Sequence, residues 1–294
     1  MSITYIRHLT FCIALMFLCS CSADEVNEVG VKTLSTLIKN AVVYDGTGEN
    51  SFQADVRIED GLIAEIGMID AREGEQVWDA NGLALAPGFI DPHSHHDTKL
   101  MKKPAPKSAL GQGITTIVSG LDGGASTFGD PFISIEHNYS VFQQNPAAIN
   151  LAYFAPHDTY REIVMGDDFK RTATDEELEK MSQMLRRDME AGALGLSTGL
   201  EYEPSLYSKT EEVIELAKIA AVYGGKYSSH IRSEDIKVTE AIDEVLTIAR
   251  EANIPANISH IKLAMYAIHG NAPEVIEKLN KASDEGLDIR ADIY

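Results

Sequence analysis

Short apolar segments alternate with helix-forming segments from residue 88 to residue 294, and this alternation constrains the fold more than any other feature. Strands that are separated by helices favour a parallel sheet with right-handed crossovers. The sequence therefore predicts an α/β fold. The seven expected strands cover residues 89–91, 115–119, 149–154, 194–198, 226–230, 256–260 and 289–294.

The segments between these strands carry the signals that begin and end helices. Thr174 and Glu177 form a capping box for a helix that extends to about residue 191. Because a (β/α)8 barrel needs eight strand–helix units, residues 87–294 are expected to form a TIM-type barrel that is incomplete, with about seven strands. Further helices are expected at residues 211–223, 238–251 and 273–285.

A different pattern precedes the expected barrel. Residues 54–58 alternate between apolar and polar side chains, and Asp60-Gly61 is a hairpin signal before the next apolar segment. Residues 36–86 are therefore expected to form a small β-domain of the sandwich type. Residues 22–35 are polar and lack apolar periodicity, and we expect them to form a tether.

The N-terminus has the pattern of an export signal. An apolar run over residues 9–18 follows Arg7, and it is too short to span a bilayer comfortably. The run ends in Leu18-Cys19-Ser20-Cys21, which resembles the lipobox of bacterial lipoproteins. We therefore expect residues 1–21 to be a lipoprotein signal peptide and Cys21 to carry the lipid, which gives a periplasm-facing lipoprotein of the cell envelope. The alternative is an ordinary signal peptide that is cleaved near Ala23.

The composition narrows the classes of ligand. A net charge of −20 argues against nucleic-acid binding, which needs basic patches. The membrane is expected to be a partner only through the lipid anchor. All three cysteines lie within residues 12–21, so the rest of the chain offers no thiolate to a metal.

Four histidines stand at or near the ends of expected strands. His93 and His95 are two residues apart, so on a strand their imidazoles lie on one face. His230 and His260 each close a later strand. The carboxyl ends of barrel strands meet at one rim, and neutral imidazole is a good zinc ligand. The sequence thus predicts a zinc site, although a single histidine taken alone is more often structural.

Longer motifs carry a resemblance to a known family. A β-domain followed by Pro-Gly-Phe-Ile-Asp-x-His-x-His resembles the amidohydrolase superfamily. Within it, residues 37–294 look like the D-aminoacylase (N-acyl-D-amino-acid deacylase) branch. The motifs specific to that branch lie at residues 192–204, 229–234 and 259–262.

The resemblance implies a set of ligands. His93 and His95 match the ligands of the more buried metal, and His230 and His260 match those of the tighter one. The family usually has a cysteine in a glycine-rich turn after the second strand, and here Asp122 stands in its place. A carboxylate can bind zinc, so Asp122 is the expected substitute, with a plain turn residue as the alternative. Glu201 is the alternative bridging carboxylate; one or two Zn²⁺ ions are expected.

The resemblance also implies contacts with the substrate. Tyr202, Lys262 and Tyr294 match positions that contact the substrate in this branch. The charge of Lys262 suits a free carboxylate, and the alternative is a solvated surface lysine. Arg232 and Glu234 are expected either to pair near the site or to form an ordinary surface ion pair. His96 and His157 are expected to be structural, and the alternative is that they support the metal ligands from outside the ligand set.

The implied reaction is zinc-dependent hydrolysis of N-acyl-D-amino acids to a carboxylate and a free D-amino acid. In the superfamily the general base is an Asp of the eighth strand, expected here beyond residue 294. One alternative is a cyclic-amide hydrolase of the dihydroorotase or hydantoinase type, although residues 194–202 lack the lysine of those enzymes. A D-amino-acid dipeptidase and a non-catalytic metal-binding lipoprotein are further alternatives.

One prediction concerns the 294-residue chain on its own. We expect it to be nearly inactive, because the resemblance places the general base outside it. Turnover of N-acetyl-D-amino acids by the purified, zinc-loaded chain measures this directly. Appreciable turnover would show that a residue within 1–294 serves as the base.

Overall fold

The computed structural model describes residues 35–293, so the expected signal peptide, Cys21, most of the expected tether and Tyr294 lie outside the described part. The described residues divide into two compact units, one before and one after the boundary between Pro87 and Gly88. Each unit is described by itself.

The first unit is built on one mixed sheet. Its strands are β1 (Ser35–Val43), β2 (Phe52–Glu59), β3 (Leu62–Gly67), β4 (Gln76–Asp79) and β5 (Ala84–Leu85). Antiparallel pairing joins β3 to β2 and β2 to β1, and both β4 and β5 run parallel to β1. Asp60 and Gly61 have φ of 50° and 80°, as a tight hairpin requires.

The expectation of a β-sandwich in this unit was wrong. A sandwich has two facing sheets, whereas the described strands of this unit form a single sheet. The reason is that β4 and β5 pair with two successive stretches of the same strand, Thr36–Lys39 and Val42–Val43 of β1. The core of the unit is small, and its main cluster is formed by Ala41, Val43, Ala54 and Val56.

The second unit carries the parallel strands expected from the sequence. The strands are β6 (Phe89–Asp91), β7 (Ile114–Ser119), β8 (Asn150–Tyr153), β9 (Ala155–Pro156), β10 (Gly195–Gly199), β11 (Lys226–His230), β12 (Ala256–Ile258) and β13 (Ile289–Ala291). They pair in parallel as β6-β7-β8 and as β9-β10-β11-β12-β13. The strand expected at residues 149–154 is β8, and β9 follows it directly and belongs to the other sheet. The described strands keep the sequential order of a TIM barrel but do not close into a ring.

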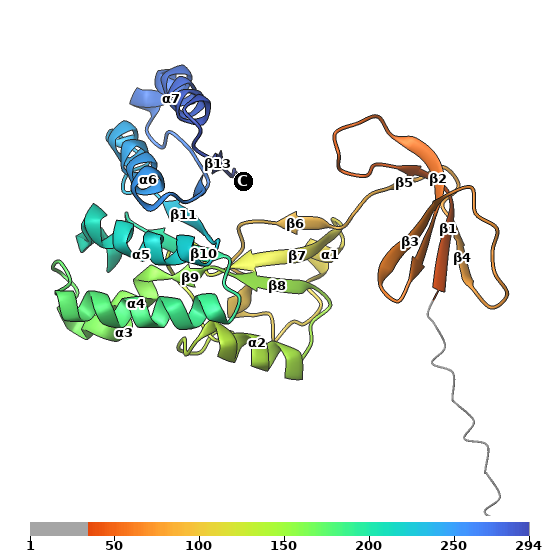
Figure 1. Ribbon diagram of the computed structural model, residues 1–294, viewed down its shortest axis with the longest axis horizontal. Helices are drawn as coiled ribbons and strands as arrows, with labels where there is room; N and C mark the ends of the chain where they lie inside the picture. The colour runs from red at the N-terminus through yellow and green to blue at the C-terminus, as the bar shows by residue number, and fades with distance from the viewer. Residues whose placement is uncertain (1–34, 294) are drawn as a thin grey trace, which may run out of the picture. The chain divides into compact units, whose positions relative to one another are not determined.

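Helices connect the strands. They are α1 (Lys107–Leu110), α2 (Ile135–Gln144), α3 (His157–Met165), α4 (Asp175–Glu190), α5 (Thr210–Val222), α6 (Val238–Ala252) and α7 (Ala272–Asp284). The capping box at Thr174 and Glu177 is formed, with both reciprocal hydrogen bonds. Figure 1 shows α4, α5, α6 and α7 following one another along one side of the strands. Within residues 35–293, no helix is both long and apolar enough to span a bilayer.

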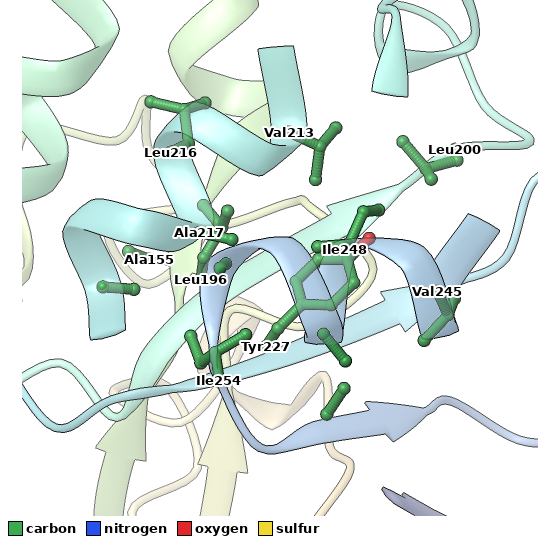
Figure 2. Packing of buried hydrophobic residues seen from close by; sticks show 14 of the residues in the cluster. Ala155, Leu196, Leu200, Val213, Leu216, Ala217, Tyr227, Val245, Ile248 and Ile254 are labelled. Carbon is green, nitrogen blue, oxygen red and sulfur yellow. The ribbon is translucent and has the colours of Figure 1, made fainter. Parts of the chain in front are cut away.

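Alternation along the strands separates an apolar face from a polar one. Leu196 of β10 and Tyr227 of β11 are fully buried in the main core with Leu216 and Ala217 of α5 (Figure 2). Their neighbours on the strands point the other way. Among these neighbours, Ser197 Oγ accepts a hydrogen bond from the backbone N–H of Gly123, which follows β7. The strands therefore pack on the helices with one face and hold polar groups on the other.

Candidate metal centre

Asp122 lies among the histidines that the sequence marks. It follows β7 in a turn where its φ is +52°, a conformation that aspartate tolerates better than most residues. Its Oδ2 lies 3.1 Å from His93 Nε2, 3.4 Å from His95 Nε2 and 3.4 Å from His260 Nε2. The structure thus gathers residues that follow three different strands around one carboxylate oxygen.

His230 completes the cluster from the end of β11. Its Nδ1 lies 3.0 Å from His260 Nε2. Two sets therefore offer ligand atoms within 4.8 Å of one another: His93, His95 and Asp122 in one, and Asp122, His230 and His260 in the other. Asp122 belongs to both sets, which is the position of a ligand that two cations could share.

The donors fit zinc in kind and in spacing. Ligand atoms bound tetrahedrally at about 2.0–2.1 Å from zinc lie about 3.3 Å from one another. The distances around Asp122 Oδ2 and between the two facing nitrogens, 3.0–3.4 Å, match that spacing. Asp122 Oδ1 is buried and has no hydrogen-bond partner among the described residues. A buried carboxylate oxygen without a donor is a group that a cation would satisfy.

The electrostatics of the cluster favour positive charge. Burial lowers the pKa of His93, but hydrogen bonds with Asp122 and Asp292 outweigh it and raise the pKa to about 9. Burial raises the pKa of Asp122, yet hydrogen bonds from His260, His93 and His95 hold that pKa well below its usual range. The environment that favours an ionised carboxylate beside imidazolium also favours a divalent cation, which displaces the imidazole protons when it binds.

Glu201 contacts the other side of His230. Its Oε2 lies 2.9 Å from His230 Nε2, whereas Nδ1 of the same ring is the atom that lies nearest to His260. A third set of potential ligands is formed by Glu201, His230 and Glu234. The structure thus places the two carboxylates considered as bridging ligands, Asp122 and Glu201, in contact with different histidine nitrogens.

The expected pair of Arg232 and Glu234 is not formed. Arg232 instead donates two hydrogen bonds of 2.8 Å to Glu244 of α6. Glu234 accepts a hydrogen bond from Lys262 and lies 2.9 Å from His260 Nδ1. Proximity in sequence was misleading because α6 brings Glu244 back over the loop that carries Arg232.

The expected substrate contacts that the structure describes lie beside the histidines. The ring of Tyr202 is 4.3 Å from the ring of His230 between centroids, and about half of the Tyr202 side chain is exposed. Lys262 Nζ lies 2.9 Å from His260 Nδ1. His96 bonds to Ser94 Oγ at 2.6 Å, and His157 is buried against Glu212, so neither belongs to the sets around Asp122.

Asp292 lies in the site, although the sequence analysis assigned it no role there. It follows β13, and its Oδ1 lies 3.2 Å from His93 Nδ1 and accepts the backbone N–H of His260 at 2.6 Å. Its Oδ2 accepts a hydrogen bond of 2.6 Å from Asn257. The available signal was its place at the end of the last expected strand, where side chains turn toward the same rim as the histidines.

A buried carboxylate supports the turn that carries Glu201. Asp158 Oδ1 accepts hydrogen bonds from Ser205 Oγ at 2.6 Å and from the backbone N–H of Gly199 at 3.0 Å. Burial is the main reason why the pKa of Asp158 is raised, to about 6. Asp158 Oδ1 also lies beside Gly123 in the turn after β7, so one buried side chain supports the segments that carry Asp122 and Glu201.

Gly123 is expected to be intolerant of any side chain. Its φ is +73°, and a Cβ there would lie 1.7 Å from Asp158 Oδ1. Gly123→Ala should therefore lower the free energy of unfolding by at least about 1 kcal/mol from backbone strain alone. Gly124→Ala is the matched control, because its Cβ would meet nothing within 4 Å. Equal thermal unfolding midpoints for the two variants would contradict this packing.

The comparison with known proteins identifies the family. The family model described as "Amidohydrolase family" matches residues 76–292. The chain belongs to this amidohydrolase family.

Several of the similar proteins are deacylases. The D-aminoacylase of Alcaligenes xylosoxydans xylosoxydans is 32% identical over 278 residues, which cover 88% of this chain and 56% of the relative. The zinc and phosphonate complex of N-acyl-D-glutamate deacylase from Bordetella bronchiseptica has a TM-score of 0.84 at 32% identity, covering 90% of this chain and 59% of that one. A D-aminoacylase structure described for its binuclear metal centre has a TM-score of 0.83 at 29% identity, covering 88% and 58%. The amidohydrolase chain thus spans little more than half the length of these relatives.

Proposed function

We propose that the full-length protein is a zinc-dependent hydrolase that cleaves the amide bond of N-acyl-D-amino acids. The observation that carries the proposal is the position of Asp122 Oδ2, within 3.4 Å of three imidazole nitrogens. The deacylase relatives supply the substrate class. Both the D-aminoacylase and the N-acyl-D-glutamate deacylase are named for this kind of substrate.

In this proposal, His93, His95, Asp122, His230 and His260 hold one or two zinc ions. Zinc at such a site polarises a carbonyl and lowers the pKa of a bound water toward neutrality. Lys262 lies beside His260, and its ammonium group suits the free carboxylate of an N-acyl amino acid. Tyr202 provides a half-exposed ring next to His230, which can cover the substrate on the solvent side.

The assay pairs enantiomers. Full-length protein with zinc is incubated with N-acetyl-D- and N-acetyl-L-amino acids, and the free amino acid is measured. Release from the D-series is the expected result, and it should disappear in His230→Ala. Release only from cyclic amides or from D-amino-acid dipeptides would replace the proposed substrate class. If the protein bound no zinc, the proposed metal centre would be wrong.

We also propose that the protein is anchored in the cell envelope through a lipid on Cys21. The support is the sequence alone, since an apolar run ends in Leu18-Cys19-Ser20-Cys21. Cys21→Ser should release the protein from the membrane fraction, and Cys19→Ser is the matched control. Membrane association that survives Cys21→Ser would contradict the anchor.

A further inference from the structure

Three histidines of the proposed centre share a pattern that the ligand set alone does not explain. Each turns one ring nitrogen toward the Asp122 cluster and the other toward a separate carboxylate. His93 Nδ1 lies 3.2 Å from Asp292, and His230 Nε2 lies 2.9 Å from Glu201. His260 Nδ1 lies 2.9 Å from Glu234.

A neutral imidazole has one N–H and one lone pair, so only one nitrogen can bind a cation. A carboxylate accepts the N–H and thereby leaves the lone pair on the opposite nitrogen. In His93 and His260 the opposite nitrogen is Nε2, which faces Asp122. In His230 it is Nδ1, which faces His260 Nε2 at 3.0 Å. Two nitrogens that face each other so closely share either a proton or a cation.

We infer that Glu201, Glu234 and Asp292 are positioning residues, which fix the tautomers and the orientations of His230, His260 and His93. The inference rests on the proposed metal centre and deepens it. It also assigns Glu201 a place outside the ligand set, because Glu201 is bonded to the nitrogen of His230 that does not face His260.

Glu234 has a second contact that supports this role. It is 8% exposed, and its carboxylate accepts a hydrogen bond from Lys262. Lys262 Nζ also lies 2.9 Å from His260 Nδ1, so the proton between them has two possible arrangements. The ammonium group has Glu234 and the backbone carbonyl of His260, at 3.1 Å, as acceptors. The Nδ1 proton is assigned to Glu234, because a carboxylate is a stronger acceptor than a carbonyl and the ammonium group of Lys262 already donates to other acceptors. One buried carboxylate therefore aligns both a proposed ligand and the proposed substrate-binding lysine.

The carboxylates of Glu201, Glu234 and Asp292 are expected to raise the affinity for zinc without binding the ion themselves. Partners of this kind typically contribute about 10- to 100-fold in metal affinity. In the full-length protein, Glu201→Ala and Glu234→Ala should each weaken zinc binding by about that factor in competition with a chromophoric chelator. Gln at either position should restore most of the affinity, because its amide oxygen still accepts the imidazole N–H.

Glu203→Ala is the matched control, because Glu203 lies two residues from Glu201 but pairs with exposed Lys170 and with Tyr207. Its zinc affinity should equal that of the unchanged protein. The visible spectrum of the cobalt-substituted protein gives a second readout. Its bands should keep their positions in Glu201→Ala, since a positioning residue does not bind the ion.

The possible results separate the inference from the proposed function. Unchanged zinc affinity in both alanine variants would overturn the inference and leave the centre intact. Loss of one equivalent of metal in Glu201→Ala, or a shifted cobalt spectrum without rescue by Gln, would make Glu201 a ligand and also overturn it. Absence of zinc and cobalt binding in the unchanged protein would overturn the proposed centre, and this inference with it.

Discussion

Asp122→Ala should remove most zinc binding and lower hydrolysis at least about 100-fold, more than the loss of an outer partner. Asp122 Oδ2 lies within 3.4 Å of a ring nitrogen of each of His93, His95 and His260, so its loss affects both proposed positions. Zinc content after dialysis and the rate of amino-acid release check the two parts of the prediction.

Two further variants separate the ligand from the backbone. Alanine at φ +52° adds strain, whereas asparagine tolerates this conformation and removes only the charge. Asp122→Asn should therefore fold normally and still bind zinc poorly. Asp122→Cys should keep zinc, because a thiolate is also a good zinc ligand. Full zinc content in Asp122→Asn would rule out the carboxylate as a ligand.

Arg161→Ala should destabilise the second unit by about 3–5 kcal/mol, the range for breaking a buried ion pair. Arg161 has no exposed surface, and its Nη1 donates to both oxygens of Glu212 at 2.6 and 2.8 Å. The other guanidinium nitrogens donate to the backbone carbonyls of Phe169, Arg171 and Pro204. Alanine would leave a buried carboxylate and three carbonyls without these donors. Chemical denaturation followed by circular dichroism measures the loss.

Controls show whether burial is the cause. Lys218→Ala removes a surface ion pair with Glu215, in which both side chains are about half exposed, and should cost no more than about 1 kcal/mol. The double change Arg161→Met with Glu212→Met should cost less than Arg161→Ala, because no buried charge is left unpaired. If Arg161→Ala is no more destabilising than Lys218→Ala, the buried pair does not stabilise the fold as described.

The strands and helices of the second unit could be predicted because their signals are local. Apolar segments of strand length and the capping box at Thr174 depend on neighbouring residues only. The short strand β9, which begins just after the expected strand at residues 149–154, could not be read in this way. Phe154 separates β8 from β9, and its backbone N–H bonds to Ser119 of β7 while the flanking residues pair with different neighbours.

In the site, too, the features that depend on local sequence could be predicted and the long-range contacts could not. Histidines that end parallel strands were expected at one rim, and the structure places them there. The partners of Glu234 and the contact of Asp292 with His93 depend on segments that are distant in sequence. The sequence around Glu234 does not indicate that Lys262 would donate a hydrogen bond to it. The sequence around Arg232 does not indicate that Glu244 would be its partner. Such pairings are set by how the helices pack, which the local pattern does not contain.

The carboxylate at position 122 also affects how the centre would respond to oxidants. A thiolate ligand can be oxidised to sulfenic or sulfinic acid, and its metal is then lost. Residues 22–294 contain no cysteine, so the proposed ligands are imidazoles and one carboxylate. Peroxide and thiol-alkylating reagents would therefore find no thiol among these ligands. An oxygen donor is also a harder ligand than sulfur, so it should raise the affinity of the centre for hard divalent ions such as Mn²⁺.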